Sequence, residues 1–496
     1  MLFNSFQFVL FILPVLALYT ILGRIGGAAD RTSGHSEKND GAERRDDLGR
    51  KLQNRFLFVA SLIFYGAWDW RFLALILAST VVDYCCGLRL NNPQVSVRRR
   101  YLILSLMFNL GMLGVFKYFN FFTQSALELM RAVGVNASAD VVAILLPVGI
   151  SFYTFQTLSY TIDVYQRKIK AATNFWDFAL YVAFFPQLVA GPIEKARQFL
   201  PQIQRARVQT LEKCSSGTFL IFWGLFKKVF VADNCAEIVN LIFRGTEDPT
   251  GFQYLIGAYA FSWQIYCDFS GYSDIARGLA RLMGFELMLN FNMPYFSESL
   301  SDFWRRWHIS LSTWFKEYLY IPLGGNRAGR GRLVFNLMTV FVVSGLWHGA
   351  ATNFLVWGTL HGVGLVILVL CSPQIRMLTG RIPRQVWKPL AVFLTFHYVA
   401  FAFAIWQTET SLAWFGMMAE VLTSPGFEIR DLGLLGKLAA FVAIPLLVQW
   451  RMKVNNDPEL PLKWPLFGRV LFYTVCLFAL LRFGVFDGAE FIYFQF

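Results

Sequence analysis

Charged residues are scarce in this 496-residue chain, and cysteines are few and scattered. Only 16% of the residues are Asp, Glu, Lys or Arg, whereas 56% are hydrophobic and 17% are aromatic. This balance excludes an ordinary soluble protein. The seven cysteines contain no CxxC pair, so we expect neither a disulfide framework nor a metal site.

The signatures of several soluble enzyme classes are also absent. The sequence contains no GxSxG nucleophile elbow, no P-loop, no HExxH zinc motif and no GxGxxG dinucleotide fingerprint. It shows no internal repeat of the kind found in many transporters. The formal net charge of +13 does not indicate nucleic-acid binding, because the Lys and Arg residues gather in short loops between apolar runs. In such loops they orient membrane helices and meet anionic lipid headgroups.

Apolar runs recur along the whole chain and predict the fold class. Since a membrane-spanning helix needs about 20 apolar residues, the runs predict an all-α integral membrane protein with about 11 to 13 membrane helices. We expect one polytopic domain over residues 1–496, with residues 1–22 as a retained first helix. Residues 24–55 hold eight Lys or Arg residues and many polar residues, and they predict a flexible cytoplasmic loop. That loop places the N-terminus outside.

Ionisable residues inside the apolar runs are the candidates for function, because charge at membrane depth is costly unless it serves a site or a partner. His348 ends an apolar run, and histidine is the side chain best suited to accept a proton near neutral pH. His308 follows two arginines and has aromatic neighbours. His361 lies about 220° from His348 on a continuous helix. We therefore expect His361 to be structural.

The segment around His308 combines aromatic and basic residues. Its large apolar residues recur every three or four positions, which predicts one amphipathic helix with an aromatic stripe. Two interpretations stay open: an interfacial helix with arginines reaching the headgroups, or an entrance where basic side chains hold the phosphates of an acyl carrier. The stripe comprises Trp304, Trp307, Leu311, Trp314, Phe315 and Tyr318.

Several long stretches together carry a family resemblance. They are LPVGISFYTFQTLSYTIDVYQ, FFPQLVAGPIEK, YCDFSGYSDIARGLARLMGF, WRRWHISLSTWFKEYLYIPLGGNR, SGLWHGAATNFLVWGTLHG and the terminal FIYFQF. In this order they resemble the membrane-bound O-acyltransferase family (MBOAT), in the bacterial branch of the alginate O-acetyltransferase membrane subunit. The loop at residues 26–50 is longer and more polar than we expect of that branch.

The resemblance implies a funnel or pore through a ring of tilted or re-entrant helices, with an acyl donor on the cytoplasmic side and an exported acceptor outside. It maps the principal catalytic residue to His348 and a partner near the donor path to His308. We expect His348 to take the proton of an acceptor hydroxyl as the hydroxyl attacks an acyl thioester. His308 or Asn353 would stabilise the oxyanion that develops.

Two further groups of residues are candidates for the substrate paths. Basic residues could hold the donor, although the positive-inside rule explains many such charges. A polar cluster could line the acceptor side, or could instead pin helices together through hydrogen bonds. The donor candidates are Arg305, Arg306, Lys227 and Lys228, and the acceptor candidates are Asp268, Ser270, Tyr272 and Asp274.

The resemblance implies an O-acyltransferase that moves an acyl group, expected to be acetyl, from a cytoplasmic thioester to a hydroxyl. The acceptor would be an exported polysaccharide such as alginate, another exopolysaccharide, peptidoglycan or a periplasmic partner. We expect no bound cofactor, with acetyl-CoA or an acyl carrier protein thioester as co-substrate. The expected setting is a bacterial inner membrane, with a periplasmic transferase as partner and no nucleic acid. The alternatives are a transporter or channel, or a non-catalytic scaffold of a polysaccharide export complex.

Overall fold

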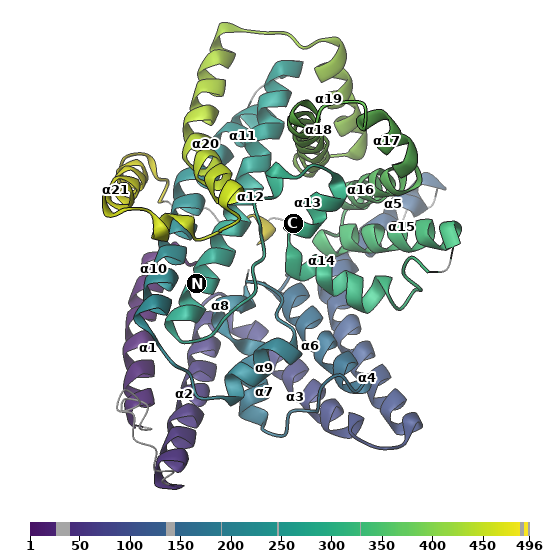
Figure 1. Cartoon of the computed structure of the whole chain (residues 1–496). Helices are drawn as coiled ribbons and strands as arrows, with labels where there is room; N and C mark the ends of the chain where they lie inside the picture. The colour runs from purple at the N-terminus through teal and green to yellow at the C-terminus, as the bar shows by residue number, and fades with distance from the viewer. Residues whose placement is uncertain are drawn as a thin grey trace. The chain divides into compact units, whose positions relative to one another are not determined.

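The computed structural model describes residues 1–25, 40–134, 144–189, 191–245, 248–327, 329–486 and 491–494, and every regular element in these ranges is helical (Figure 1). The predicted all-α class is confirmed. Eight helices of this part of the chain are long and apolar enough to span a membrane. They are Phe6–Arg24, Trp70–Leu90, Val95–Ala132, Leu211–Gly245, Thr352–Leu370, Arg384–Gln407, Ile429–Asn455 and Leu466–Phe483.

Eight spans are fewer than the 11 to 13 expected from apolar runs of about 20 residues. Some of those runs form helices that are too short to cross a bilayer by themselves. Helix α6 (Ile150–Tyr165), for example, has only 16 residues and is buried over almost its whole length. The protein is therefore a multi-pass membrane protein in which several apolar helices serve as core.

The chain divides into two compact units. The first comprises Met1–Ile221 and Ala276–Met288, and the second comprises Phe222–Ile275 and Leu289–Phe496. In the first unit, α3, α4 and α6 pack against one another, and so do α1 and α2. Its principal helices are α1 (Phe6–Ile25), α2 (Asp40–Gly66), α3 (Leu73–Leu90), α4 (Val95–Leu113), α5 (Phe119–Ala132), α6, α7 (Phe175–Ala183) and α9 (Ala196–Gln204).

The loop predicted at residues 24–55 is wrong in its second half. Helix α2 begins at Asp40 and continues through the polar stretch into the apolar run as one 27-residue helix. Asp47 pairs with Arg50 and with Lys51 at 2.5 Å each, and such pairs three or four residues apart stabilise a helix. Composition alone predicted a loop, because the proportion of polar residues does not show which opposite charges lie three or four positions apart. Residues 26–39 lie outside the described residues, so the first half stays a prediction.

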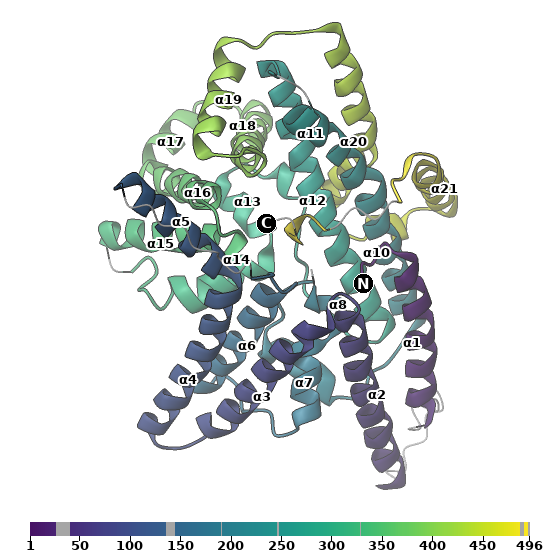
Figure 2. The ribbon, with the colours of Figure 1, turned by 180° about the vertical axis from the view of Figure 1, so that it is seen from behind.

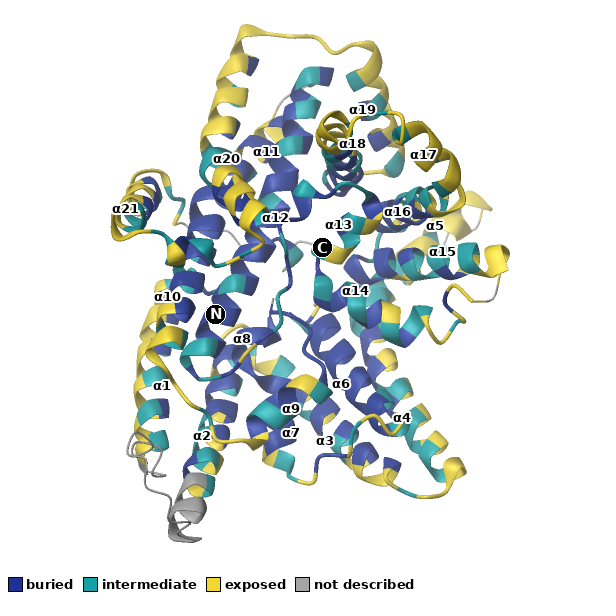
Figure 3. Ribbon diagram, in the orientation of Figure 1, coloured by how far each residue is buried: buried dark blue, intermediate teal, exposed yellow. Residues whose placement is uncertain are grey.

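The second unit contains a long central helix and a set of helices that pack around it. The part of α12 (Gly251–Leu282) up to Ile275 is buried along most of its length, whereas α20 and α21 expose much of their surface (Figure 3). The reverse view shows the same helices from behind (Figure 2). The other helices are α11 (Asp233–Asn240), α13 (Leu300–Arg306), α14 (Ile309–Phe315), α15 (Gly329–His348), α16 (Thr352–Leu370), α17 (Ser372–Thr379), α18 (Arg384–Ala404), α19 (Ser411–Thr423), α20 (Ile429–Asn455) and α21 (Leu466–Phe483).

Helices α15 and α16 cross in close contact at two glycines. A Cβ atom at Gly345 would overlap the carbonyl oxygen of Phe354, and one at Gly358 would overlap that of Phe341. Small residues at such crossings let the backbones of membrane helices approach closely. The crossing brings His348, at the end of α15, against Trp357 of α16, with ring centroids 5.0 Å apart.

We expect Gly358→Leu to destabilise the protein, because its side chain would have to displace the backbone of α15. Overpacking of this kind typically costs about 1–3 kcal/mol. The matched control is Gly433→Leu on α20, where a Cβ atom meets nothing within 4 Å. Thermal unfolding of both purified variants in the same detergent checks the prediction. Equal melting temperatures for the two variants would contradict the close crossing.

Candidate active site

Two buried histidines face each other in the second unit. His308 is fully buried and His348 is 3% exposed, and their ring centroids lie 6.4 Å apart. This spacing lets one small reacting group contact both imidazoles. The structure therefore places together the two histidines that the sequence motifs single out.

Aromatic rings enclose His348. Its ring centroid lies 5.0 Å from those of Trp347 and Trp357, 5.3 Å from Trp406 and 5.7 Å from Tyr493. Because His348 is the last residue of α15, it also sits at the negative end of the helix dipole.

His308 occupies a break between two helices, so the single striped helix predicted for this segment is wrong. Helix α13 ends at Arg306 and α14 begins at Ile309, and His308 between them has φ 43° and ψ 56°. Such left-handed geometry costs a non-glycine residue about 1–3 kcal/mol and is often found at functional sites. The break separates the residues of the stripe and turns His308 toward His348.

Asn290 holds this strained turn in place, and the sequence gives no signal for it. Its backbone carbonyl accepts the N–H of Ile309 at 2.9 Å. Its side-chain oxygen accepts the hydroxyl of Ser310 at 2.9 Å and the N–H of Ser310 at 3.2 Å. Asn290 is fully buried, so its side-chain oxygen bonds the turn and not solvent, while its amide nitrogen donates to Ser273 at 3.3 Å.

The C-terminal segment also packs around the two histidines; we call His308, His348 and the aromatic rings that contact them the chamber. Tyr493 packs against His348 and lies 4.7 Å from Phe269, whose ring is 4.6 Å from that of His308. Phe491 packs on Tyr272 at 4.6 Å. The sequence pointed to the terminal FIYFQF only as part of the family resemblance. Its contact with the histidines emerges from the structure.

Asp268 holds that segment in place. Its carboxylate accepts the backbone N–H of Ile492 at 2.7 Å and pairs with Lys228 at 3.0 Å. Lys228 also pairs with Asp233 at 2.8 Å, and all three side chains are buried. A buried charge is retained only when it is paired, so this network fixes the C-terminal segment relative to α12.

Two of the donor candidates, Lys227 and Lys228, form one network with acceptor candidates on α12. Lys227 donates to Asp274 at 2.7 Å and to Ser270 at 2.9 Å, beside the Lys228–Asp268 pair. Both lysines are buried and paired with carboxylates, which argues against a role in holding donor phosphates. The alternative reading of the polar cluster, hydrogen bonds that pin helices, fits these contacts better.

Asn353 and Arg306, also candidates from the sequence, lie outside this network. Asn353 donates to the carbonyl of Thr408 at 2.6 Å and accepts from Ser411 at 2.9 Å, so its amide joins α16 to the segment before α19 and to α19 itself. These bonds make Asn353 a weaker candidate for the oxyanion than His308. Arg306 donates to Asp302 at 3.0 Å and is held on α13.

His361 is closer to the chamber than the expectation of one continuous helix suggested. The chain breaks between α15 and α16, and His361 packs on the far side of Trp357, with ring centroids 4.8 Å apart. Neither of its ring nitrogens has a hydrogen-bond partner within the described residues. Since Trp357 lies between His361 and His348, we keep the structural role as a prediction.

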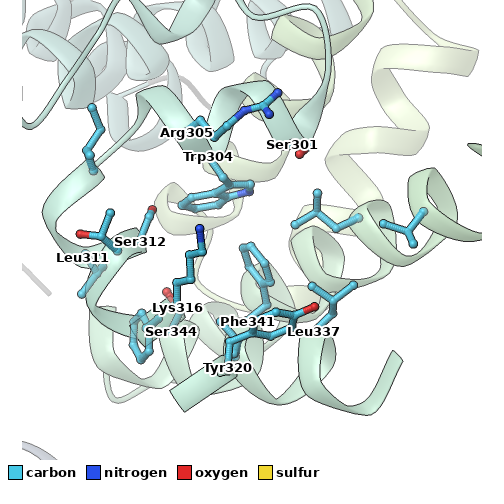
Figure 4. A pocket seen from close by; sticks show the side chains of 16 residues that line it. Ser301, Trp304, Arg305, Leu311, Ser312, Lys316, Tyr320, Leu337, Phe341 and Ser344 are labelled. Carbon is cyan, nitrogen blue, oxygen red and sulfur yellow. The ribbon is translucent and has the colours of Figure 1, made fainter. Parts of the chain in front are cut away.

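A cavity of about 370 Å³ lies beside the chamber, between α13–α14 and α15–α16. Trp304 and Phe341 form walls, and the side chain of Lys316 points toward Trp304 while Arg305 points away (Figure 4). Trp304 in turn contacts Trp357 at 5.7 Å, and Trp357 contacts His348. A chain of ring contacts through Trp304 and Trp357 therefore runs from the cavity to His348.

Comparisons with known proteins identify the family of this chain. Residues 68–406 match the model of the MBOAT, membrane-bound O-acyltransferase family. The chain is 42% identical over 369 residues to "Probable alginate O-acetylase AlgI" of Pseudomonas aeruginosa, covering 74% of this chain and 69% of that one. The Pseudomonas putida protein of the same name is 36% identical over 472 residues, covering 90% and 95%.

A relative with another acceptor in its name is also similar. "Peptidoglycan O-acetyltransferase" of Helicobacter pylori is 35% identical over 381 residues, covering 71% of each chain. The family match spans both histidines of the chamber. This chain belongs to the membrane-bound O-acyltransferase family and is an enzyme of that family.

Proposed function

We propose that the enzyme transfers an acetyl group from a cytoplasmic thioester to a hydroxyl of an exported polysaccharide or of a periplasmic partner. The observation that carries this proposal is the buried pair of His308 and His348 inside an aromatic chamber. Burial away from bulk water protects a thioester from hydrolysis and strengthens the electrostatic interactions around it.

His348 acts as the general base in this reaction. It takes the proton of the acceptor hydroxyl while the hydroxyl oxygen forms a bond to the thioester carbon. The carbon–sulfur bond then breaks, and the thiolate leaves with the proton that His348 held. His308, on the other side of the reacting group, stabilises the oxyanion of the tetrahedral intermediate.

The cavity lined by Trp304 and Lys316 is suited to the arm of the donor. Its walls are mostly apolar, and Lys316 has no ion-pair partner within the described residues. A phosphorylated pantetheine arm has an anionic end and a flexible chain, which match a cationic mouth and apolar walls. Ser344 lines the inner side, one helical turn before His348 on α15.

Lys316→Ala is expected to raise the KM for acetyl-CoA about tenfold or more and to leave kcat nearly unchanged. The change removes a charge-assisted hydrogen bond, which is worth about 1.5–3 kcal/mol and is made in the ground state as well as in the transition state. Lys388→Ala is the matched control, since that exposed lysine pairs with Glu298 away from the cavity. A fall in kcat with an unchanged KM would contradict the donor assignment.

Alginate is the first candidate acceptor, because relatives named as alginate O-acetylases match most of this chain. Peptidoglycan is the second, because a named peptidoglycan O-acetyltransferase is 35% identical. The donor is acetyl-CoA or a carrier-protein thioester. We place the enzyme in a bacterial inner membrane with its N-terminus outside, working with a periplasmic transferase.

The test uses purified enzyme in proteoliposomes, radiolabelled acetyl-CoA and a periplasmic transferase from the same organism, with either alginate or peptidoglycan as acceptor. We expect label to appear on one polymer and to depend on His348. Release of CoA without labelled polymer would indicate a missing partner or a wrong acceptor. No His348-dependent cleavage of any acetyl thioester would overturn the enzyme mechanism and favour a transporter or scaffold.

A further inference from the structure

A second cavity, far along the chain from the histidines, lies between α20 and α21. It measures about 490 Å³ and is lined on α20 by Ile444, Leu447, Val448 and Arg451. On the other side it is lined by Trp464, Pro465, Gly468, Leu471, Phe472, Val475 and Cys476. Both helices are candidate membrane spans, and α21 exposes most of its surface (Figures 1 and 3). This groove therefore runs along two helices that are long and apolar enough to cross the hydrocarbon layer.

Gly468 keeps the groove open. A Cβ atom there would meet only Trp464 and Pro465, at 3.6 and 4.0 Å, so no neighbouring side chain occupies the space. Phe472 and Cys476 are buried and form the floor. An occupant would meet aliphatic and aromatic surface along about two turns of each helix.

Arg451 is the one charged residue that lines the groove, and it stands at one end. It lies in the last turns of α20, and its guanidinium is 5.8 Å from the ring of Trp450. No carboxylate pairs with Arg451 in the part of the chain that the structure describes. The nearby Lys463 is paired with Asp457 at 2.7 Å, and this bond holds the pKa of Asp457 below its usual range.

Tryptophan and arginine gather where a membrane helix reaches the headgroup region. Trp450, Trp464 and Arg451 thus mark the end of the groove that lies at the membrane surface. The groove offers an apolar track that begins at an unpaired cation. This pattern matches an amphiphile with a negatively charged head and an acyl chain.

We propose that the groove between α20 and α21 is a binding site for one anionic phospholipid, with its phosphate on Arg451 and an acyl chain over Gly468. Basic pockets between membrane helices bind anionic headgroups in this way. The lipid would fill the gap beside α21 and hold that helix against α20. This site is independent of the acyl-transfer chamber and of the acceptor.

Native mass spectrometry of the purified protein tests the proposal. The protein is released from nanodiscs that contain equal amounts of phosphatidylglycerol and phosphatidylcholine of identical chains. We expect wild type to retain one phosphatidylglycerol preferentially. Arg451→Gln should lower that preference about fivefold, the factor that corresponds to about 1 kcal/mol per basic residue near an anionic lipid. Gly468→Phe should remove the retained lipid of either kind.

The matched control is Lys437→Gln, which removes another exposed cation of α20 outside the groove. It should retain phosphatidylglycerol as wild type does. Because Arg451 is exposed, its variant keeps the test valid even if Gly468→Phe fails to fold. Retention of phosphatidylglycerol by a folded Gly468→Phe variant, or equal losses in Arg451→Gln and Lys437→Gln, would overturn the proposal. So would a polypeptide that co-purifies with wild type and is lost with Gly468→Phe.

Discussion

His348→Gln is expected to lower acyl transfer about 10²- to 10⁴-fold, the usual contribution of a general base. Glutamine retains much of the volume of the imidazole, so the surrounding Trp347, Trp357 and Trp406 should stay in place. The variant cannot take up the proton of the acceptor hydroxyl. The measurement is the initial rate of polymer labelling in proteoliposomes, together with the melting temperature of the purified variant.

His397→Gln is the control for this experiment. His397 lies on α18, outside the chamber, and contacts the hydroxyl of Tyr259 at 2.5 Å. The His397→Gln variant should have a melting temperature close to that of wild type and an unchanged rate of acyl transfer. Transfer by His348→Gln at more than a tenth of the wild-type rate, with both variants folded, would rule out His348 as the base.

The second large effect is expected from Asp268→Ala, although Asp268 touches neither histidine. The change frees the N–H of Ile492 and removes a carboxylate from Lys228. Without this bond Tyr493 can leave its place against His348. Displacement by about 1 Å can lower a rate about 10²-fold. Breaking a buried ion pair by removing one partner costs about 3–5 kcal/mol.

Two comparison variants separate this positioning role from a loss of stability. Asp431→Ala removes another fully buried carboxylate of the second unit, which accepts from Gln253 at 2.9 Å away from the chamber. It should lower the melting temperature but spare the transfer rate of the folded fraction. Asp268→Asn retains an oxygen for Ile492 and should recover most of the rate. Equal rates for Asp268→Ala and Asp431→Ala would contradict the assigned role.

Sequence pattern predicted much of the class and the chemistry of this protein. Apolar runs indicate membrane helices because only helices and closed barrels satisfy backbone hydrogen bonds in lipid. Histidines within such runs stand out because ionisable groups at membrane depth are rare. His308 and His348 were accordingly found from local context and from the family motifs around them.

The spacing of residues along the chain gave a wrong prediction where a contact with a residue distant in the sequence determines the backbone conformation. Spacing of Trp304, Trp307 and Leu311 predicted one helix, but Asn290 binds the backbone at Ile309 and stabilises a left-handed break at His308. Because Lys227 and Lys228 are charged residues within an apolar run, the sequence indicated that they could hold the acyl donor. Both lysines pair with carboxylates on α12, contacts that the apolar run does not reveal.

By itself the sequence determined that the chain is a multi-pass membrane enzyme with His348 and His308 as its chemical candidates, because hydropathy and motifs are read from neighbouring residues. Only the tertiary structure decided that the C-terminus completes the chamber. Asp268 and Ile492 are separated by 224 positions, and no periodicity connects residues so far apart. Their hydrogen bond exists because buried backbone and carboxylate groups must find partners where lipid offers none.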